Sequence, residues 1–141
     1  MIDQTVGDVM NEQVRTVAPE QTARDVARLF AEHGIGSAVV VGETSAPVGI
    51  VTESDIMEQV AAGADIEAVR VESFLTSPLV SVARSADIHA AADLMKEHSI
   101  RRLPVVEDGD LLGIVTTTDL THYLPRLRNT ILRERSQFAG H

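Results

Sequence analysis

Apolar residues along the chain follow two kinds of spacing, and each kind predicts one type of element. Spacings of three and four residues predict helices over 22–33 and 85–98. The helical stripes are Val26, Leu29, Phe30 and His33 in the first, and Ile88, Ala91, Ala92 and Met95 in the second. Short continuous runs of aliphatic residues predict strands instead. These runs are 14–17, 37–41, 48–52, 79–82, 103–106 and 111–116.

Turn residues separate the predicted strands. The acidic segment Glu107-Asp108-Gly109-Asp110 lies between two aliphatic runs, which indicates a hairpin, and 42–47 occupies the corresponding place earlier in the chain. Further helices are expected over 54–62 and 118–124. The predicted order is therefore β-α-β-β-α, and it occurs twice.

The two halves also match residue by residue. A shift of 65 residues places Val17 on Val82 and Glu32-His33 on Glu97-His98. After one deletion near Pro47 the shift becomes 64 and places Gly49-Ile-Val-Thr52 on Gly113-Ile-Val-Thr116. We interpret this as a tandem duplication, which must be recognised before any fold is assigned.

A half of about 60 residues is marginally stable by itself, so we expect the halves to share one core. The predicted fold is α/β (α+β), with two β-α-β-β-α repeats packed sheet to sheet about a pseudo-twofold axis. The predicted boundaries are 5–62 for the first repeat, 63–70 for a linker, 71–124 for the second repeat and 125–141 for a C-terminal helix and tail. A proline at 125 is expected to kink or restart the last helix.

Composition narrows the possible functions. Twelve basic and 21 acidic residues give a net charge of −9, which argues against a nucleic-acid binder. Cysteine is absent, which excludes disulfides and thiolate chemistry, and the apolar runs are too short to cross a membrane. Without a signal-like N-terminus, a cytoplasmic protein is expected. Acidic residues are in excess, and Lys96 is the only lysine. Adaptation to high salt is one explanation of this composition, and an ordinary acidic composition is the alternative.

Candidate chemistry lies in two matching segments, Gly49-Ile-Val-Thr-Glu-Ser-Asp55 and Gly113-Ile-Val-Thr-Thr-Thr-Asp119. In each, a strand ends at a threonine and an aspartate follows in the first turn of a helix. One interpretation is a capping box that stabilises the start of the helix. The other is a nucleotide site, in which the carboxylate accepts hydrogen bonds from ribose hydroxyls while hydroxyls and amides face a phosphate.

With these motifs and the segment His98-Ser-Ile-Arg-Arg-Leu-Pro-Val-Val106, residues 5 to about 124 resemble a tandem pair of cystathionine β-synthase (CBS) domains, a Bateman module. The resemblance implies a non-catalytic regulatory module that binds AMP, ADP or ATP in clefts between the repeats. It also implies a homodimer. Because no effector domain is fused, we expect either a separate effector protein that receives the signal or a protein that acts by sequestering its ligand. A structural dimerisation module without ligand, or a binder of S-adenosylmethionine or NAD, is the alternative.

Carried over to this sequence, the resemblance places ribose on Asp55 and Asp119. Phosphate or ribose would contact Thr52, Ser54, Thr116 and Thr118. Adenine would lie against strand residues of each repeat, and arginines would bind phosphate. The adenine residues are Val17, Gly36, Ser37 and Ala38 in the first repeat and Val82, Leu103 and Pro104 in the second; the arginines are Arg101 and Arg102.

The halves differ at the arginines, because the counterparts of Arg101-Arg102 are Gly36-Ser37. We therefore expect a stronger site at Asp119. The Asp55 site would be weaker, empty or differently selective, and would borrow phosphate charge across the pseudo-twofold axis. A solvated arginine pair that balances the acidic surface is the alternative interpretation of Arg101 and Arg102.

Other chemistry is less well supported. His33 and His98 each end a predicted helix, where a capping or packing role is more plausible than a metal site, and no metal is expected. No catalytic triad, carboxylate pair or phosphate-binding glycine loop is visible. The candidate dimer surface is an aliphatic stripe of the closing helices. It consists of Leu120, Tyr123, Leu124, Leu127 and Ile131, with Ile56, Met57 and Val60 on the matching helix. Arginines 126, 128, 133 and 135 are expected on a solvated helix face.

Overall fold

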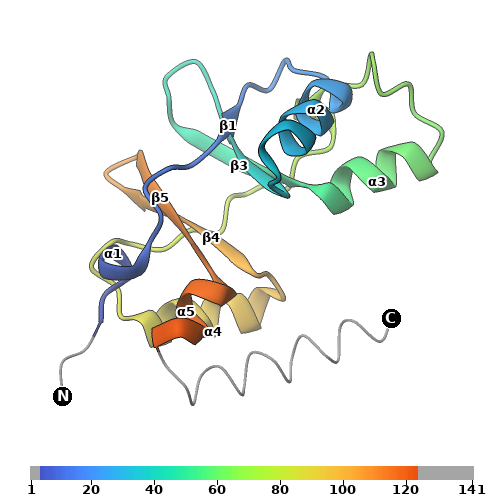
Figure 1. Cartoon of the computed structure of the whole chain (residues 1–141). Helices are drawn as coiled ribbons and strands as arrows, with labels where there is room; N and C mark the ends of the chain where they lie inside the picture. Colours follow the sequence, from blue (N-terminus) through green and yellow to red (C-terminus); the bar gives the residue numbers. More distant parts are fainter. Residues whose placement is uncertain (1–3, 124–141) are drawn as a thin grey trace. The chain divides into compact units, whose positions relative to one another are not determined.

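The computed structural model describes residues 4–123, and these divide into two compact units (Figure 1). One unit consists of residues 14–80 and is called the 14–80 unit. The other joins residues 4–13 to residues 81–123 and is called the 81–123 unit.

The 14–80 unit is built around a three-stranded sheet with the order β1-β2-β3. Strand β1 (Thr16–Val17) runs parallel to β2 (Ser37–Val41), and β2 pairs antiparallel with β3 (Pro47–Thr52). Helix α2 (Ala23–His33) connects β1 to β2, and α3 (Glu53–Ala61) follows β3 directly. The two helices pack beside each other (Figure 1).

Burial in this unit follows the predicted stripes. Val26 and Phe30 of α2 are buried against the sheet residues Val40 and Val51, with Leu29 packed at the margin of this core. His33, which ends the predicted stripe, is exposed in the last turn of α2. The apolar side of the sheet is therefore covered by the helix that the sequence spacing predicts.

The 81–123 unit repeats this arrangement with fewer regular strands. Helix α4 (Ile88–His98) precedes the antiparallel hairpin of β4 (Arg102–Glu107) and β5 (Asp110–Thr116), and α5 (Thr117–Tyr123) follows β5 directly. Val82 forms an isolated parallel bridge to Val105, at the place that β1 occupies in the other unit. Ile88, Ala91, Ala92 and Met95 are all buried, as the helical spacing predicts.

The two long helices end in the same backbone conformation on different residues. Gly34 follows α2 with a φ of 61°, and Ser99 follows α4 with a φ of 55°. Glycine adopts this left-handed conformation without steric cost, whereas serine does not. The helix of the 81–123 unit is therefore terminated at some cost in stability.

Each hairpin is completed by a short segment that the predicted boundaries assign to the other repeat. Asn11 exchanges two backbone hydrogen bonds with Ile114 of β5, and Thr76 does the same with Ile50 of β3. Helix α1 (Val6–Val9), which precedes Asn11, buries Val6 and Val9. Contacts therefore divide the chain after residues 13 and 80, while the predicted repeat boundaries, which follow sequence similarity, stay a prediction.

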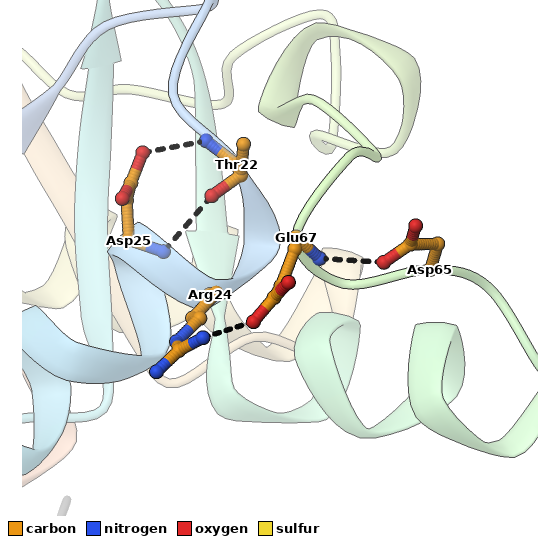
Figure 2. A network of polar contacts seen from close by, with 5 residues as sticks. All are labelled: Thr22, Arg24, Asp25, Asp65 and Glu67. Carbon is orange, nitrogen blue, oxygen red and sulfur yellow. Dashed lines mark hydrogen bonds and ion pairs between the residues drawn. The ribbon is translucent and has the colours of Figure 1, made fainter.

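The segment predicted as a linker is docked on the start of α2. The amide of Ala23 donates to the carbonyl of Val69, and the amide of Arg24 donates to the carbonyl of Ile66, each with a distance of 2.9 Å. Figure 2 shows that the Arg24 side chain also forms an ion pair with Glu67, beside the capping box of α2. Residues 64–70 therefore belong to the packed structure of the 14–80 unit.

The mixed α/β fold class and the order of the main elements are confirmed. Three local predictions differ. Helix α4 begins at Ile88 rather than 85, because Asp87 caps it and accepts the His89 amide. Residues 79–82 form only the bridge at Val82, and α1 and the 3₁₀ turn Val71–Ser73 were not predicted. Sheet-to-sheet packing about a pseudo-twofold axis stays a prediction, and the C-terminal helix and tail of 125–141 lie outside the described residues.

Candidate functional site

The two predicted motifs form matching turns where a strand passes into a helix. In the 14–80 unit, Oδ2 of Asp55 accepts the backbone amide of Thr52 at 2.7 Å and its hydroxyl at 3.1 Å. In the 81–123 unit, Oδ2 of Asp119 accepts the amide of Thr116 at 2.8 Å. The threonine hydroxyl in turn accepts the aspartate amide, over 3.4 and 3.2 Å respectively. Both turns are therefore complete capping boxes.

The same box occurs at two other helix starts. Thr22 and Asp25 cap α2, and Thr5 and Asp8 cap α1. At Asp8 the amide and hydroxyl of Thr5 lower the pKa of the carboxyl, with a smaller contribution from the charge of Arg84. Capping alone thus accounts for a Thr-x-x-Asp motif in this protein.

Asp55 and Asp119 differ from the other two aspartates in their surroundings. In both cases the threonine of the capping box is the last residue of a sheet strand. Asp55 and Asp119 are also half-buried, whereas Asp8 and Asp25 are exposed. Within residues 4–123, the hydrogen bonds that the carboxylates of Asp55 and Asp119 accept all go to Oδ2. Each carboxylate therefore keeps Oδ1 as an acceptor in a partly sheltered position.

The structure brings several of the predicted site residues together in each unit. Ser37 pairs with Thr52 across β2 and β3, and the carbonyl of Gly36 accepts the amide of Glu53 at 3.0 Å. The 81–123 unit repeats both contacts. There Arg102 pairs with Thr116, and the carbonyl of Arg101 accepts the amide of Thr117 at 3.0 Å.

The residues predicted to hold adenine have mostly buried side chains. Val17, Ala38, Val82 and Leu103 belong to the cores, and Pro104 is buried with them. The amide of Val82 donates to Pro104 at 3.0 Å and is therefore already paired, whereas its carbonyl accepts from Val106 at 3.0 Å and keeps a second lone pair. Contact with adenine at these positions stays a prediction.

The hydroxyl residues Ser54 and Thr118 are exposed at the second position of α3 and α5. Glu53 and Thr117 occupy the first positions, and neither was singled out from the sequence. The signal was present, because the 64-residue shift aligns Glu53 with the uncharged Thr117. This charge difference adds to the difference between Gly36 and Arg101.

The predicted dimer stripe is only partly exposed. Leu120 is fully buried in the 81–123 unit, so its predicted place on an exposed stripe was wrong, and Ile56 is partly buried against the core of the 14–80 unit. Each is the fourth residue of its helix, and both helices contact the strand that they follow. Met57 and Val60 of α3 are 67% and 57% exposed, and Tyr123 is exposed as well. Leu124, Leu127 and Ile131 lie outside the described residues, as do arginines 126, 128, 133 and 135.

His33 and His98 lie in the last turns of α2 and α4, as predicted. Among residues 4–123, no group of three or more histidine, aspartate or glutamate side chains is arranged to hold a metal ion. Of the helices in the same range, none has the length and apolar character needed to cross a bilayer.

Comparison with known proteins identifies relatives over most of the chain. The family model of the CBS domain matches residues 6–62 and 71–126. The uncharacterized protein MK0525 of Methanopyrus kandleri is 38% identical, with 95% of this chain and 69% of that protein covered. The CBS domain-containing protein YhcV of Bacillus subtilis is 36% identical, with 82% of each chain covered.

Solved structures of similar proteins have the same fold. The CBS domain protein TA0289 of Thermoplasma acidophilum matches with a TM-score of 0.84 and 26% identity, over 95% of this chain and 78% of that one. Hypoxic Response Protein I, crystallised with two coordinated zinc ions, matches with a TM-score of 0.78 and 32% identity, over 86% and 100% of the two chains. Both repeats match the family and the fold agrees, so the chain belongs to the CBS domain family and carries a tandem pair of CBS domains, a module that is commonly regulatory and ligand-binding.

Proposed function

We propose that the chain is a non-catalytic regulatory module that binds an adenosine-containing ligand of the AMP, ADP or ATP class. Asp55 and Asp119 would each accept hydrogen bonds from the two neighbouring hydroxyls of a ribose. Membership of the CBS family supports ligand binding in general. The observation that carries the assignment is the pair of half-buried carboxylates, each with Oδ2 held by a capping box and Oδ1 left as an acceptor.

Arg101 and Arg102 support a phosphate-bearing ligand at the Asp119 site. Arg102 begins β4 opposite Thr116, and Arg101 precedes it, so both arginines start at the end of the strand pair that carries the Thr116–Asp119 box. Guanidinium groups bind phosphate through paired, charge-assisted hydrogen bonds. We therefore expect the Asp119 site to bind nucleotides more tightly than the Asp55 site.

A regulatory role requires that the ligand favour one arrangement of the protein over another. A ligand with equal affinity for both arrangements shifts no equilibrium, however tightly it binds. In this proposal an effector protein recognises the arrangement that the nucleotide stabilises. The experiment below concerns the first step, which is binding itself.

The decisive experiment is titration calorimetry with AMP, ADP and ATP on the wild-type chain and on Asp119→Ala, Asp55→Ala and Asp25→Ala. Asp25 is a matched control, because it makes the same capping box on the exposed start of α2. All three variants lose the acidic partner of a capping box, which stabilises the helix start by about 0.3–1 kcal/mol. We expect Asp119→Ala to weaken binding by about tenfold or more, since one charge-assisted interaction is lost, and Asp25→Ala to leave affinity unchanged.

Two results would contradict the proposal. Equal weakening by Asp25→Ala and Asp119→Ala would mean that the effect comes from helix capping. Absence of thermal stabilisation by millimolar AMP, ATP, S-adenosylmethionine and NAD would favour a structural module without ligand. Equal losses for Asp55→Ala and Asp119→Ala would refute only the predicted difference between the two sites.

We also propose that the chain forms a homodimer through α3. Met57 and Val60 lie one turn apart on this helix and are both exposed, and solvent exposure of such a pair is unfavourable in an isolated chain. Val60→Glu should shift the sedimentation coefficient toward that of a monomer. Val48→Glu is the matched control, because Val48 is an exposed valine on β3 of the same unit. An unchanged association state in Val60→Glu would exclude α3 as the interface.

A further inference from the structure

The two repeats differ in charge at two pairs of equivalent positions, Glu53 with Thr117 and Gly36 with Arg101. Glu53 and Thr117 are equivalent because each is the first residue of the helix that carries the aspartate. Gly36 and Arg101 are equivalent because the carbonyl of each accepts the amide of that first helical residue, at 3.0 Å in both units. The comparison therefore rests on matching hydrogen bonds as well as on the alignment of the two halves.

The side chain of Glu53 lies against the bare Cα of Gly36. A Cβ atom added to Gly36 would come within 2.9 Å of Cδ and 3.0 Å of Cγ of Glu53, closer than such atoms normally approach. A side chain at position 36 would thus displace the glutamate. In the 81–123 unit, position 101 carries an arginine and the first helical residue is the buried, uncharged Thr117. Glu53 therefore occurs together with Gly36 in the 14–80 unit, and Thr117 occurs together with Arg101 in the 81–123 unit.

The resulting difference in charge is large for so few residues. Positions 36, 37, 53, 54 and 55 carry two acids and no base, which gives a formal charge of −2. Positions 101, 102, 117, 118 and 119 carry two bases and one acid, which gives +1. A phosphate is repelled by the first set and attracted by the second, although the charges of Glu53 and Arg101 are exposed and therefore partly screened by water.

We infer that Glu53 determines ligand class at the Asp55 site by excluding phosphate. This inference rests on the proposed binding of adenosine compounds through Asp55 and Asp119. The Asp55 site then takes an adenosine whose 5′ substituent is uncharged or cationic, such as adenosine itself, a thioether or a sulfonium derivative. The Asp119 site takes a phosphate-bearing nucleotide. One chain would thus respond to two chemically different adenosine compounds.

The experiment measures each site alone. In an Asp119→Ala background, which leaves only the Asp55 site, titration calorimetry compares adenosine with AMP, two ligands that differ only in the phosphate. We expect adenosine to bind more tightly than AMP. Adding Glu53→Gln should then raise AMP affinity by about tenfold, because one negative charge near the phosphate is removed, and should leave adenosine affinity unchanged.

The matched control is Glu58→Gln in the same background. Glu58 is exposed like Glu53 but lies further along the same helix, so its substitution changes the net charge equally at a greater distance from the site. Equal gains in AMP affinity from Glu53→Gln and Glu58→Gln would overturn the inference, because the effect would then reflect net charge alone. In the reciprocal Asp55→Ala background, Arg101→Gln should weaken AMP and spare adenosine.

Failure of the inference and failure of the proposed function give different results. If neither adenosine nor AMP binds the wild-type chain, the proposed function is wrong. If both bind the Asp55 site equally well and Glu53→Gln changes neither affinity, the site exists but Glu53 does not select its ligand. Urea unfolding of each variant checks that the compared chains are folded to the same extent.

Discussion

Gly113 is the position where a single methyl group should separate the N-terminal segment from the hairpin it completes. Gly113 lies on β5 and is buried beneath residues 10 and 11. A Cβ at this position would lie 2.8 Å from the carbonyl oxygen of Asn11 and 2.9 Å from Sδ of Met10. The methionine side chain can move away, whereas the backbone carbonyl is held by its hydrogen bond.

The expected loss of stability follows from these contacts. Asn11 donates to Ile114 over 2.8 Å and accepts from it over 2.9 Å, and the added methyl group pushes this pair apart. Two weakened backbone hydrogen bonds cost about 1 kcal/mol each. Overpacking adds roughly 1–3 kcal/mol. Gly113→Ala should therefore lower the free energy of unfolding by about 3–5 kcal/mol.

Urea unfolding followed by circular dichroism measures this loss, with Gly42→Ala as the control. An alanine Cβ at Gly42 would meet Val48 at 3.8 Å, an ordinary contact, so this variant should unfold at or slightly above the wild-type midpoint. Gly49→Ala should resemble Gly113→Ala, because its Cβ would approach the carbonyl of Thr76 to 2.6 Å. Equal midpoints for Gly113→Ala and Gly42→Ala would refute the tight docking of the N-terminal segment.

Three further outcomes are expected. Ser99→Gly should raise the free energy of unfolding by about 1 kcal/mol, and Gly34→Ser should lower it by a similar amount, because both positions have a left-handed backbone conformation that favours glycine. Thermal melts of the two variants and the wild-type chain measure these changes. Folding lowers the pKa of the Asp8 carboxyl, so the ionised carboxylate stabilises the folded chain above pH 3.8, and this stabilisation is lost as the pH falls below that value. The urea midpoints of the wild-type chain and Asp8→Asn should therefore converge as the pH is lowered. A double-mutant cycle on Arg24 and Glu67 should give a coupling below about 1 kcal/mol, because both side chains are more than half exposed; a larger value would contradict this estimate.

Local order was readable from the sequence by itself. Apolar spacing located α2, and the stripe from Ile88 to Met95 located α4, because a helix that packs on a sheet must keep one side apolar. The duplication then related the hairpins and the boxes at Asp55 and Asp119 to each other. These features depend on residues close together in the chain, or on similarity between halves, and both are visible without coordinates.

Pairing between distant segments was decided only by the tertiary structure. Nothing in the sequence near Asn11 or Thr76 indicates that each adds to a hairpin of the compact unit to which it belongs, since a backbone hydrogen bond depends on position rather than on side-chain type. The burial of Leu120 and the approach of Glu53 to Gly36 have the same origin. Periodicity shows which side of a helix is apolar, but the packed chain decides which residues of that side are covered and which charges lie beside a site.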